Sequence, residues 1–140
     1  RRHPELLEEI RRRGHSWGNH TMHHLQGFKT ERRRYMRDIT EADTLIDSPL
    51  FRPPHGLIRW SQAAAIKNHY NIVMYDLVTR DYSYKMTPDR VLANVRRYAR
   101  NGSIIVFHDS LRAERNLREA LPAAIEWLKS QGYEFLPIPM

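Results

Sequence analysis

The chain has 140 residues and 28% charged residues, which is the size and composition of one globular domain with a single hydrophobic core. It contains no cysteine, so disulfides and thiolate-bound metals are excluded. No apolar run approaches the roughly 20 residues that span a bilayer, and no transmembrane segment is therefore predicted in this chain.

The net charge of +7 raises the question of an anionic partner such as nucleic acid. The two basic runs, residues 11–13 and 32–34, each fall on a predicted amphipathic helix, whose outer face is normally charged and solvated. No aromatic residues alternate with these arginines, as they would in a protein that binds single strands. We therefore expect no nucleic-acid partner.

Helix and strand alternate in the first half of the chain. Pro4 at a first helical position and Gly14 beyond the last one bound the first expected helix. Thr30 is expected to cap a second helix that runs to Ile46. The other elements expected in this half are strands at 16–19 and 50–52 and a helix from a Ser61 cap to about Asn68.

The second half continues the alternation. The runs Ile72–Leu77 and Ile104–Phe107 are short and apolar, as is typical of buried parallel strands. Thr87-Pro88 begins a helix that Asn101-Gly102 stops. The last expected elements are a helix from about Pro122 to Gln131 and a strand from Tyr133 to Leu136.

This alternation predicts an α/β fold, one domain over residues 1–140 with a parallel sheet that is covered by helices. In such folds the ligand site lies at the carboxyl ends of the strands. His20, Arg52, Asp81 and His108 each fall at or just beyond an expected strand end. We therefore expect these four side chains to meet on one face of the sheet.

The segment from Gly18 to His24 contains two imidazoles four residues apart, His20 and His24. This spacing on a helical turn places both side chains within reach of one metal ion, and a carboxylate is the commonest third ligand. Taken alone, the spacing also fits polar loop histidines without a shared ligand. His23 lies between the pair and is expected to point elsewhere.

His108 follows the most apolar expected strand and is placed to exchange a proton near neutral pH, or to bind the backbone of the next helix. Arg52 could hold a carboxylate by two hydrogen bonds, or it could be a solvated arginine in a rigid turn. Asp81 could orient a histidine or cap a turn.

Taken together, four segments resemble the NodB-type polysaccharide deacetylases, which form carbohydrate esterase family 4. Residues 14–25 resemble the H-[ST]-x-x-H metal motif with its G-H-x-x-G-N-H lead-in. Residues 52–56 are similar to R-x-P-[YF]-G, with a histidine where an aromatic residue is usual. Residues 81–82 stand where the family has Asp-Trp, and residues 106–108 match L-x-H with valine for leucine.

The resemblance implies a distorted (β/α) barrel of the NodB type that lacks its first two strands. It also implies that His20 and His24 bind a divalent metal, with Zn²⁺ expected first. The family's T-F-D-D-G motif, which carries the third ligand and the catalytic base, is expected upstream of residue 1. By the same resemblance, the fragment itself is expected to be inactive or nearly so.

The same resemblance assigns roles to the remaining residues. His108 is implied as the general acid, Asp81 as the residue that tunes it, and Arg52 as the partner of the base. The implied substrate-binding residues are His55 through its backbone N–H, Val106 beside the acetyl methyl group, and Tyr82.

The expected activity is metal-dependent removal of N-acetyl groups from an N-acetylglucosamine polymer, such as peptidoglycan or a chitin-like oligosaccharide. The alternatives are an O-acetyl esterase that acts on xylan and a non-catalytic carbohydrate-binding relative. The resemblance favours the cell envelope or secretion, although a cytoplasmic location also fits the sequence. The partner expected is a carbohydrate polymer or oligosaccharide.

Overall fold

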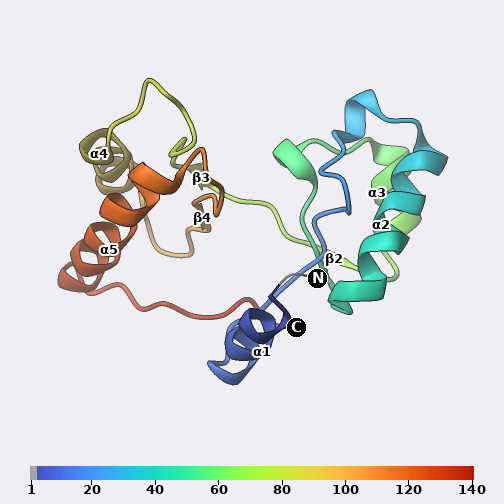
Figure 1. Cartoon of the computed structure of the whole chain (residues 1–140), viewed down its shortest axis with the longest axis horizontal. Coiled ribbons are helices and arrows are strands. Elements are labelled where there is room, and N and C mark those ends of the chain that lie inside the picture. The colour runs from blue at the N-terminus through green and yellow to red at the C-terminus, as the bar shows by residue number, and fades with distance from the viewer. Residues whose placement is uncertain (1–2) are drawn as a thin grey trace. The chain divides into compact units, whose positions relative to one another are not determined.

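The computed structural model describes residues 3–140, which form two compact units. Unit 1 contains the described residues up to Met74 together with Leu136–Met140, and unit 2 contains Tyr75–Phe135. Each unit has its own pair of parallel strands and its own helices (Figure 1). The single domain expected over residues 1–140 stays a prediction.

Unit 1 is built on a small parallel sheet. In β1 and β2, Leu50 pairs with Asn71 and Phe51 with Ile72, and Asn19 adds one parallel bridge to Phe51 on the other side. The elements of unit 1 are α1 (Pro4–Arg12), the 3-10 turn η1 (Gly27–Lys29), α2 (Arg32–Ile46), β1 (Leu50–Phe51), the 3-10 turn η2 (Pro54–Gly56), α3 (Trp60–Ile66) and β2 (Asn71–Ile72).

The core of unit 1 lies between α2, α3 and the sheet, with α2 and α3 side by side (Figure 1). Tyr35 and Ile39 repeat at helical spacing on the inner face of α2 and pack against Phe51 of β1 and Ile66 of α3. This cluster fixes α2 beneath the segment that leads from Asn19 into residues 20–24, the histidine-rich loop.

Unit 2 repeats the arrangement with two long helices. Leu77 pairs with Ile105 and Val78 with Val106. The buried cluster joins Leu77 to Val95 of α4 and to Ala124 and Leu128 of α5, and α4 and α5 lie side by side (Figure 1). The elements of unit 2 are β3 (Leu77–Val78), α4 (Pro88–Tyr98), β4 (Ile105–Val106) and α5 (Glu114–Ser130).

The strand expected over Ile72–Leu77 is wrong as one element. It is divided into β2 and β3 because its two ends pair with different strands, the first with β1 and the second with β4. The strand expected at 16–19 is reduced to the single bridge at Asn19. The strand expected at Tyr133–Leu136 does not form, and the Tyr133 N–H instead binds the Leu128 carbonyl as α5 ends.

Three expected helix starts were also wrong. The N-cap of α2 is Glu31, whose carboxylate accepts the N–H groups of Arg33 and Arg34, whereas the Thr30 hydroxyl donates to the Gln26 carbonyl. α3 starts at Trp60, one residue before the expected Ser61 cap.

The last helix starts at Glu114, well before Pro122. Its first turn is held from outside the helix, because the Asn116 side chain donates to the carbonyls of Asp81 and Met86. None of the helices described between residues 3 and 140 is long and apolar enough to cross a membrane.

Candidate functional site

The histidine-rich loop of unit 1 brings together His20 and His24. Their ring centroids lie 5.0 Å apart in an edge-to-face arrangement, and both residues are exposed. His20 Nδ1 lies 2.6 Å from the carbonyl oxygen of Arg52. Because a carbonyl only accepts hydrogen bonds, Nδ1 is the donor in this contact, and Nε2 is the ring nitrogen that would bind a metal.

The ring of His55 extends this group. It lies 4.8 Å from the ring of His24, so that three exposed imidazoles form one row. His55 belongs to η2, the short turn that follows β1, and its backbone is left-handed with φ of 58°.

Two further left-handed residues lie in the histidine-rich loop itself. Thr21 has φ of 62° and His24 has φ of 54°, a region that residues with a side chain rarely adopt. The Thr21 hydroxyl accepts the N–H of Leu25 at 3.1 Å and closes the loop. Strain of this kind concentrates at functional sites, where the surrounding contacts maintain it.

His23 does not belong to this row of rings and instead binds Asp38 of α2. Its ring Nδ1 lies 2.6 Å from one carboxylate oxygen of Asp38, and its backbone N–H donates to the other at 3.0 Å. Asp38 is buried, which raises the pKa of its carboxyl, but the bonds from His23 outweigh burial and hold that pKa below its usual range. The same bond raises the pKa of His23.

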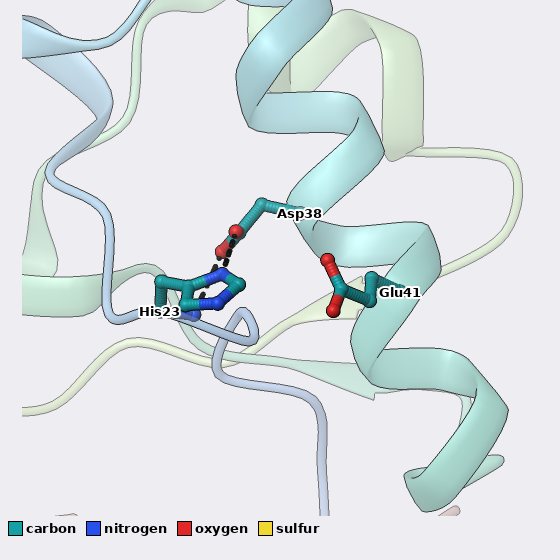
Figure 2. Close-up of side chains that lie close together, drawn as sticks. All are labelled: His23, Asp38 and Glu41. Atoms are coloured by element: carbon teal, nitrogen blue, oxygen red, sulfur yellow. Dashed lines mark hydrogen bonds and ion pairs between the residues drawn. The ribbon is translucent and has the colours of Figure 1, made fainter.

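Glu41 lies one helical turn beyond Asp38, on the same side of α2, and its carboxylate faces the His23 ring (Figure 2). Within residues 3–140, His23, Asp38 and Glu41 are the group of three side chains with ligand atoms close enough to share a metal ion, all within 4.8 Å of one another. The depression that they border is also lined by Arg34 and Arg37.

Arg52 directly follows β1, and its side chain reaches the residues that follow β2. Its guanidinium donates to the carbonyls of Val73 at 3.1 Å and Met74 at 3.4 Å. The role expected for Arg52, as the partner of a catalytic carboxylate, stays a prediction.

Unit 2 contains a second histidine held by an aspartate. His108 Nδ1 lies 2.7 Å from Oδ1 of Asp81, and the His108 N–H donates to Oδ2 at 2.7 Å. The Asp81 side chain is fully buried, whereas the side chain of His108 is 35% exposed. The carboxylate therefore orients the ring so that Nε2 is the nitrogen left to exchange a proton.

Tyr82 and Val106 border this pair. The Tyr82 ring meets the His108 ring edge-to-face at 4.7 Å, and the Tyr82 N–H donates to Asp81. Val106 ends β4 two residues before His108, and its carbonyl accepts both the N–H and the hydroxyl of Thr79.

The structure thus groups the expected site residues by unit. His20, His24, Arg52 and His55 lie in unit 1, and Asp81, Tyr82, Val106 and His108 lie in unit 2. Their expected meeting on one face of a single sheet stays a prediction.

Asp38 and Glu41 were missed by the sequence interpretation. Asp38 lies on the inner face of α2 among Tyr35, Ile39 and Ala42. A carboxylate within an apolar helical stripe is rarely buried without a partner, so the stripe itself contained the signal. The identity of the partner, His23, was not readable from spacing.

Comparison with known proteins identifies the class. Residues 1–73, just over half of the chain, match the family model described as polysaccharide deacetylase. The chain therefore belongs to the polysaccharide deacetylase family, as its four motifs suggested.

Three relatives make the comparison concrete. A peptidoglycan-N-acetylglucosamine deacetylase of Bacillus cereus is 28% identical over 98% of this chain and 68% of its own length. The crystal structure of the Bc1960 peptidoglycan N-acetylglucosamine deacetylase has a TM-score of 0.86 at 27% identity, covering 97% of this chain and 67% of that one. The structure of peptidoglycan deacetylase PdaC from Bacillus subtilis has a TM-score of 0.85, at 22% identity and the same coverage.

These structures establish the fold as that of the NodB-type deacetylases, and the strands and helices of this chain are compatible with the truncated barrel expected from sequence. The chain spans about two thirds of the length of each of these relatives.

Proposed function

We propose that this chain contributes two of the metal ligands and the proton donor of a hydrolase that removes N-acetyl groups from N-acetylglucosamine-containing polysaccharide. The observation that carries the proposal is the His20–His24 pair, with its rings 5.0 Å apart and the His20 tautomer set by the Arg52 carbonyl. The names of the relatives from Bacillus cereus and of the Bc1960 structure support the substrate class.

In unit 1, His20 and His24 would hold the ion. Two imidazoles, completed by a carboxylate and a water, are a ligand set that suits Zn²⁺ in a catalytic site. When bound, such an ion polarises a carbonyl oxygen and lowers the pKa of its water. The hydrogen bond from His20 to the Arg52 carbonyl holds the ring in the orientation that metal-binding histidines commonly need.

His55 and Arg52 are proposed to act beside this pair. His55 has a left-handed backbone within the short η2 turn. We assign its N–H to the acetyl oxygen, on which negative charge develops during hydrolysis. Arg52 is assigned to the carboxylate that serves as the base.

In unit 2, His108 is proposed as the general acid. Asp81 fixes the Nδ1 proton, and the Nε2 proton of the cationic ring would pass to the departing amine nitrogen. Tyr82 restricts the ring from one side, and we assign Tyr82 and Val106 to substrate contacts, with Val106 beside the acetyl methyl group.

Acetate release tests the proposal. The complete protein, loaded with zinc, should release acetate from N-acetylglucosamine oligomers, and His20→Ala and His24→Ala should each lose both bound zinc and activity. His69→Ala is the matched control, because His69 is an exposed histidine in the turn after α3, outside the proposed site. Unchanged zinc stoichiometry in both variants would remove His20 and His24 as ligands.

The choice of acetyl group is tested in the same assay. Acetylated xylan offers ester-linked acetyl groups, and a strong preference for it over the amide substrate would replace the N-deacetylase assignment with an O-acetyl esterase.

A further inference from the structure

Asp38 contacts the histidine-rich loop at three points. Its carboxylate accepts the backbone N–H of His23 at 3.0 Å and the ring Nδ1–H at 2.6 Å (Figure 2). Its backbone carbonyl accepts the N–H of Met22 at 3.2 Å. One helical residue therefore holds the two residues that directly precede His24.

The other end of the loop is held to the same helix. Asn19 is fully buried, and its side-chain oxygen accepts the N–H of Thr21 at 2.8 Å. Its amide nitrogen donates to the Ile39 carbonyl at 3.0 Å and to Asp43 at 2.7 Å. The inner face of α2 thus fixes the loop on both sides of His20 and His24.

The contacts between α2 and the histidine-rich loop maintain a strained backbone. Left-handed backbone at Thr21 and His24 is strained and persists only where neighbouring contacts enforce it. Without the contacts from α2, the loop would relax and the two rings would no longer be held 5.0 Å apart.

We infer that Asp38 is a positioning residue of the metal site, acting through His23 to keep the loop in the conformation that presents His20 and His24 to one ion. This inference rests on the proposed function. His23 is then the residue through which the helix holds the loop, and it is not a ligand itself.

The same side chains could instead bind a second cation directly, since His23, Asp38 and Glu41 lie close together. Two observations favour positioning. Both carboxylate oxygens of Asp38 already accept hydrogen bonds from His23, and Arg34 and Arg37 line the same depression and disfavour another positive charge.

The test measures zinc affinity in the complete protein, prepared without metal and titrated against a chromophoric chelator. Asp38→Ala removes both side-chain contacts, and Asp38→Asn keeps the shape while replacing an acceptor with a donor. Both should weaken zinc binding by roughly 10–100-fold, the usual effect of losing a residue that orients metal ligands, with one zinc still bound at saturation. The absorption bands of the cobalt-substituted protein should shift, which a purely structural loss would not cause.

His23→Ala and Glu41→Gln complete the set. His23→Ala leaves α2 intact and keeps the backbone bond to Asp38, so it should weaken zinc binding less than Asp38→Ala. Glu41→Gln is the matched control, because Glu41 only borders the ring, and its affinity should equal that of the wild type.

Two results would overturn the inference. One is unchanged zinc affinity and cobalt spectrum in His23→Ala and in the folded Asp38 variants. The other is a second zinc in the wild type that His23→Ala, Asp38→Asn and Glu41→Gln all remove, which would establish a cation site. His20→Ala separates failure of the proposed function from failure of the positioning role. If His20→Ala leaves zinc affinity unchanged, the proposed function fails. If it abolishes zinc binding while the Asp38 variants bind zinc normally, only the positioning role fails.

Discussion

Each unit contains an aspartate that binds one histidine twice, through the ring Nδ1 and the backbone N–H. In unit 1 the pair is His23 and Asp38, with contacts of 2.6 and 3.0 Å, and in unit 2 it is His108 and Asp81, with two contacts of 2.7 Å. Both aspartates are buried, but the His23 side chain is 62% exposed and that of His108 only 35%.

Under the roles proposed for these residues, one local arrangement serves two purposes. Around His108 the Tyr82 ring closes one side, so the arrangement fixes the orientation of a ring that is itself proposed to react. Around His23 the arrangement fixes a loop whose neighbouring residues are proposed to react. Variants of the first pair should therefore change catalysis, and variants of the second should change metal affinity.

The sharpest test of this contrast, with the largest expected effect, is His108→Ala. In the complete protein it should lower kcat by roughly 10²–10⁴-fold, the usual contribution of a positioned acid, while bound zinc stays at the wild-type level. A substrate whose leaving group needs no proton should recover much of the loss. Release of zinc by His108→Ala would instead make His108 a ligand, and the two pairs would no longer differ in purpose.

The second test compares stability and has an intermediate effect. Asp81→Ala leaves three partly buried donors on His108 and Tyr82 without their acceptor, and should lower the free energy of unfolding by about 3 kcal/mol. His23→Ala removes an exposed ring and one of the two hydrogen bonds to Asp38 but keeps the backbone bond, so it should destabilise the protein less. Urea denaturation measures both, and equal losses would contradict the contrast in burial.

The smallest expected effect concerns Tyr35, which lies on α2 three residues before Asp38. Tyr35 is fully buried on α2, its hydroxyl has no hydrogen-bond partner among residues 3–140, and burial, with a smaller contribution from Asp38, raises its pKa to about 12. Between the unfolded pKa near 10 and this value the native state binds more protons than the unfolded state, so the free energy of unfolding falls as pH rises.

Tyr35→Phe should therefore be neutral or stabilising by up to about 1 kcal/mol at pH 7, because no hydrogen bond is lost. It should also reduce the loss of stability above about pH 10. Tyr70→Phe is the matched control, since the Tyr70 hydroxyl donates to Asp43 and its removal should destabilise the protein at pH 7. Denaturation curves at pH 7 and pH 10.5 decide this, and a destabilised Tyr35→Phe would reveal an unseen partner.

Local patterns in the sequence determined a good part of this protein. Pro4, Thr87 and Pro88 placed the starts of α1 and α4, and apolar spacing located the inner face of α2 at Tyr35 and Ile39. The family followed from four short motifs in chain order, and the polysaccharide deacetylase match confirmed it. These features are readable because helix caps, proline geometry and apolar periodicity act over a few neighbouring residues.

Other features depended on partners distant in sequence. The run Ile72–Leu77 is divided because β2 pairs with β1 whereas β3 pairs with β4, and α5 extends back past Pro122 because Asn116 binds the Asp81 and Met86 carbonyls. The pairing of His23 with Asp38 spans fifteen positions, and that of His108 with Asp81 spans twenty-seven. The family resemblance implied that Asp81 serves His108, but nothing in the sequence paired Asp38 with His23. A buried carboxylate must find a donor, and spacing along the chain does not say which one, so only the tertiary structure decided that Asp38 holds His23.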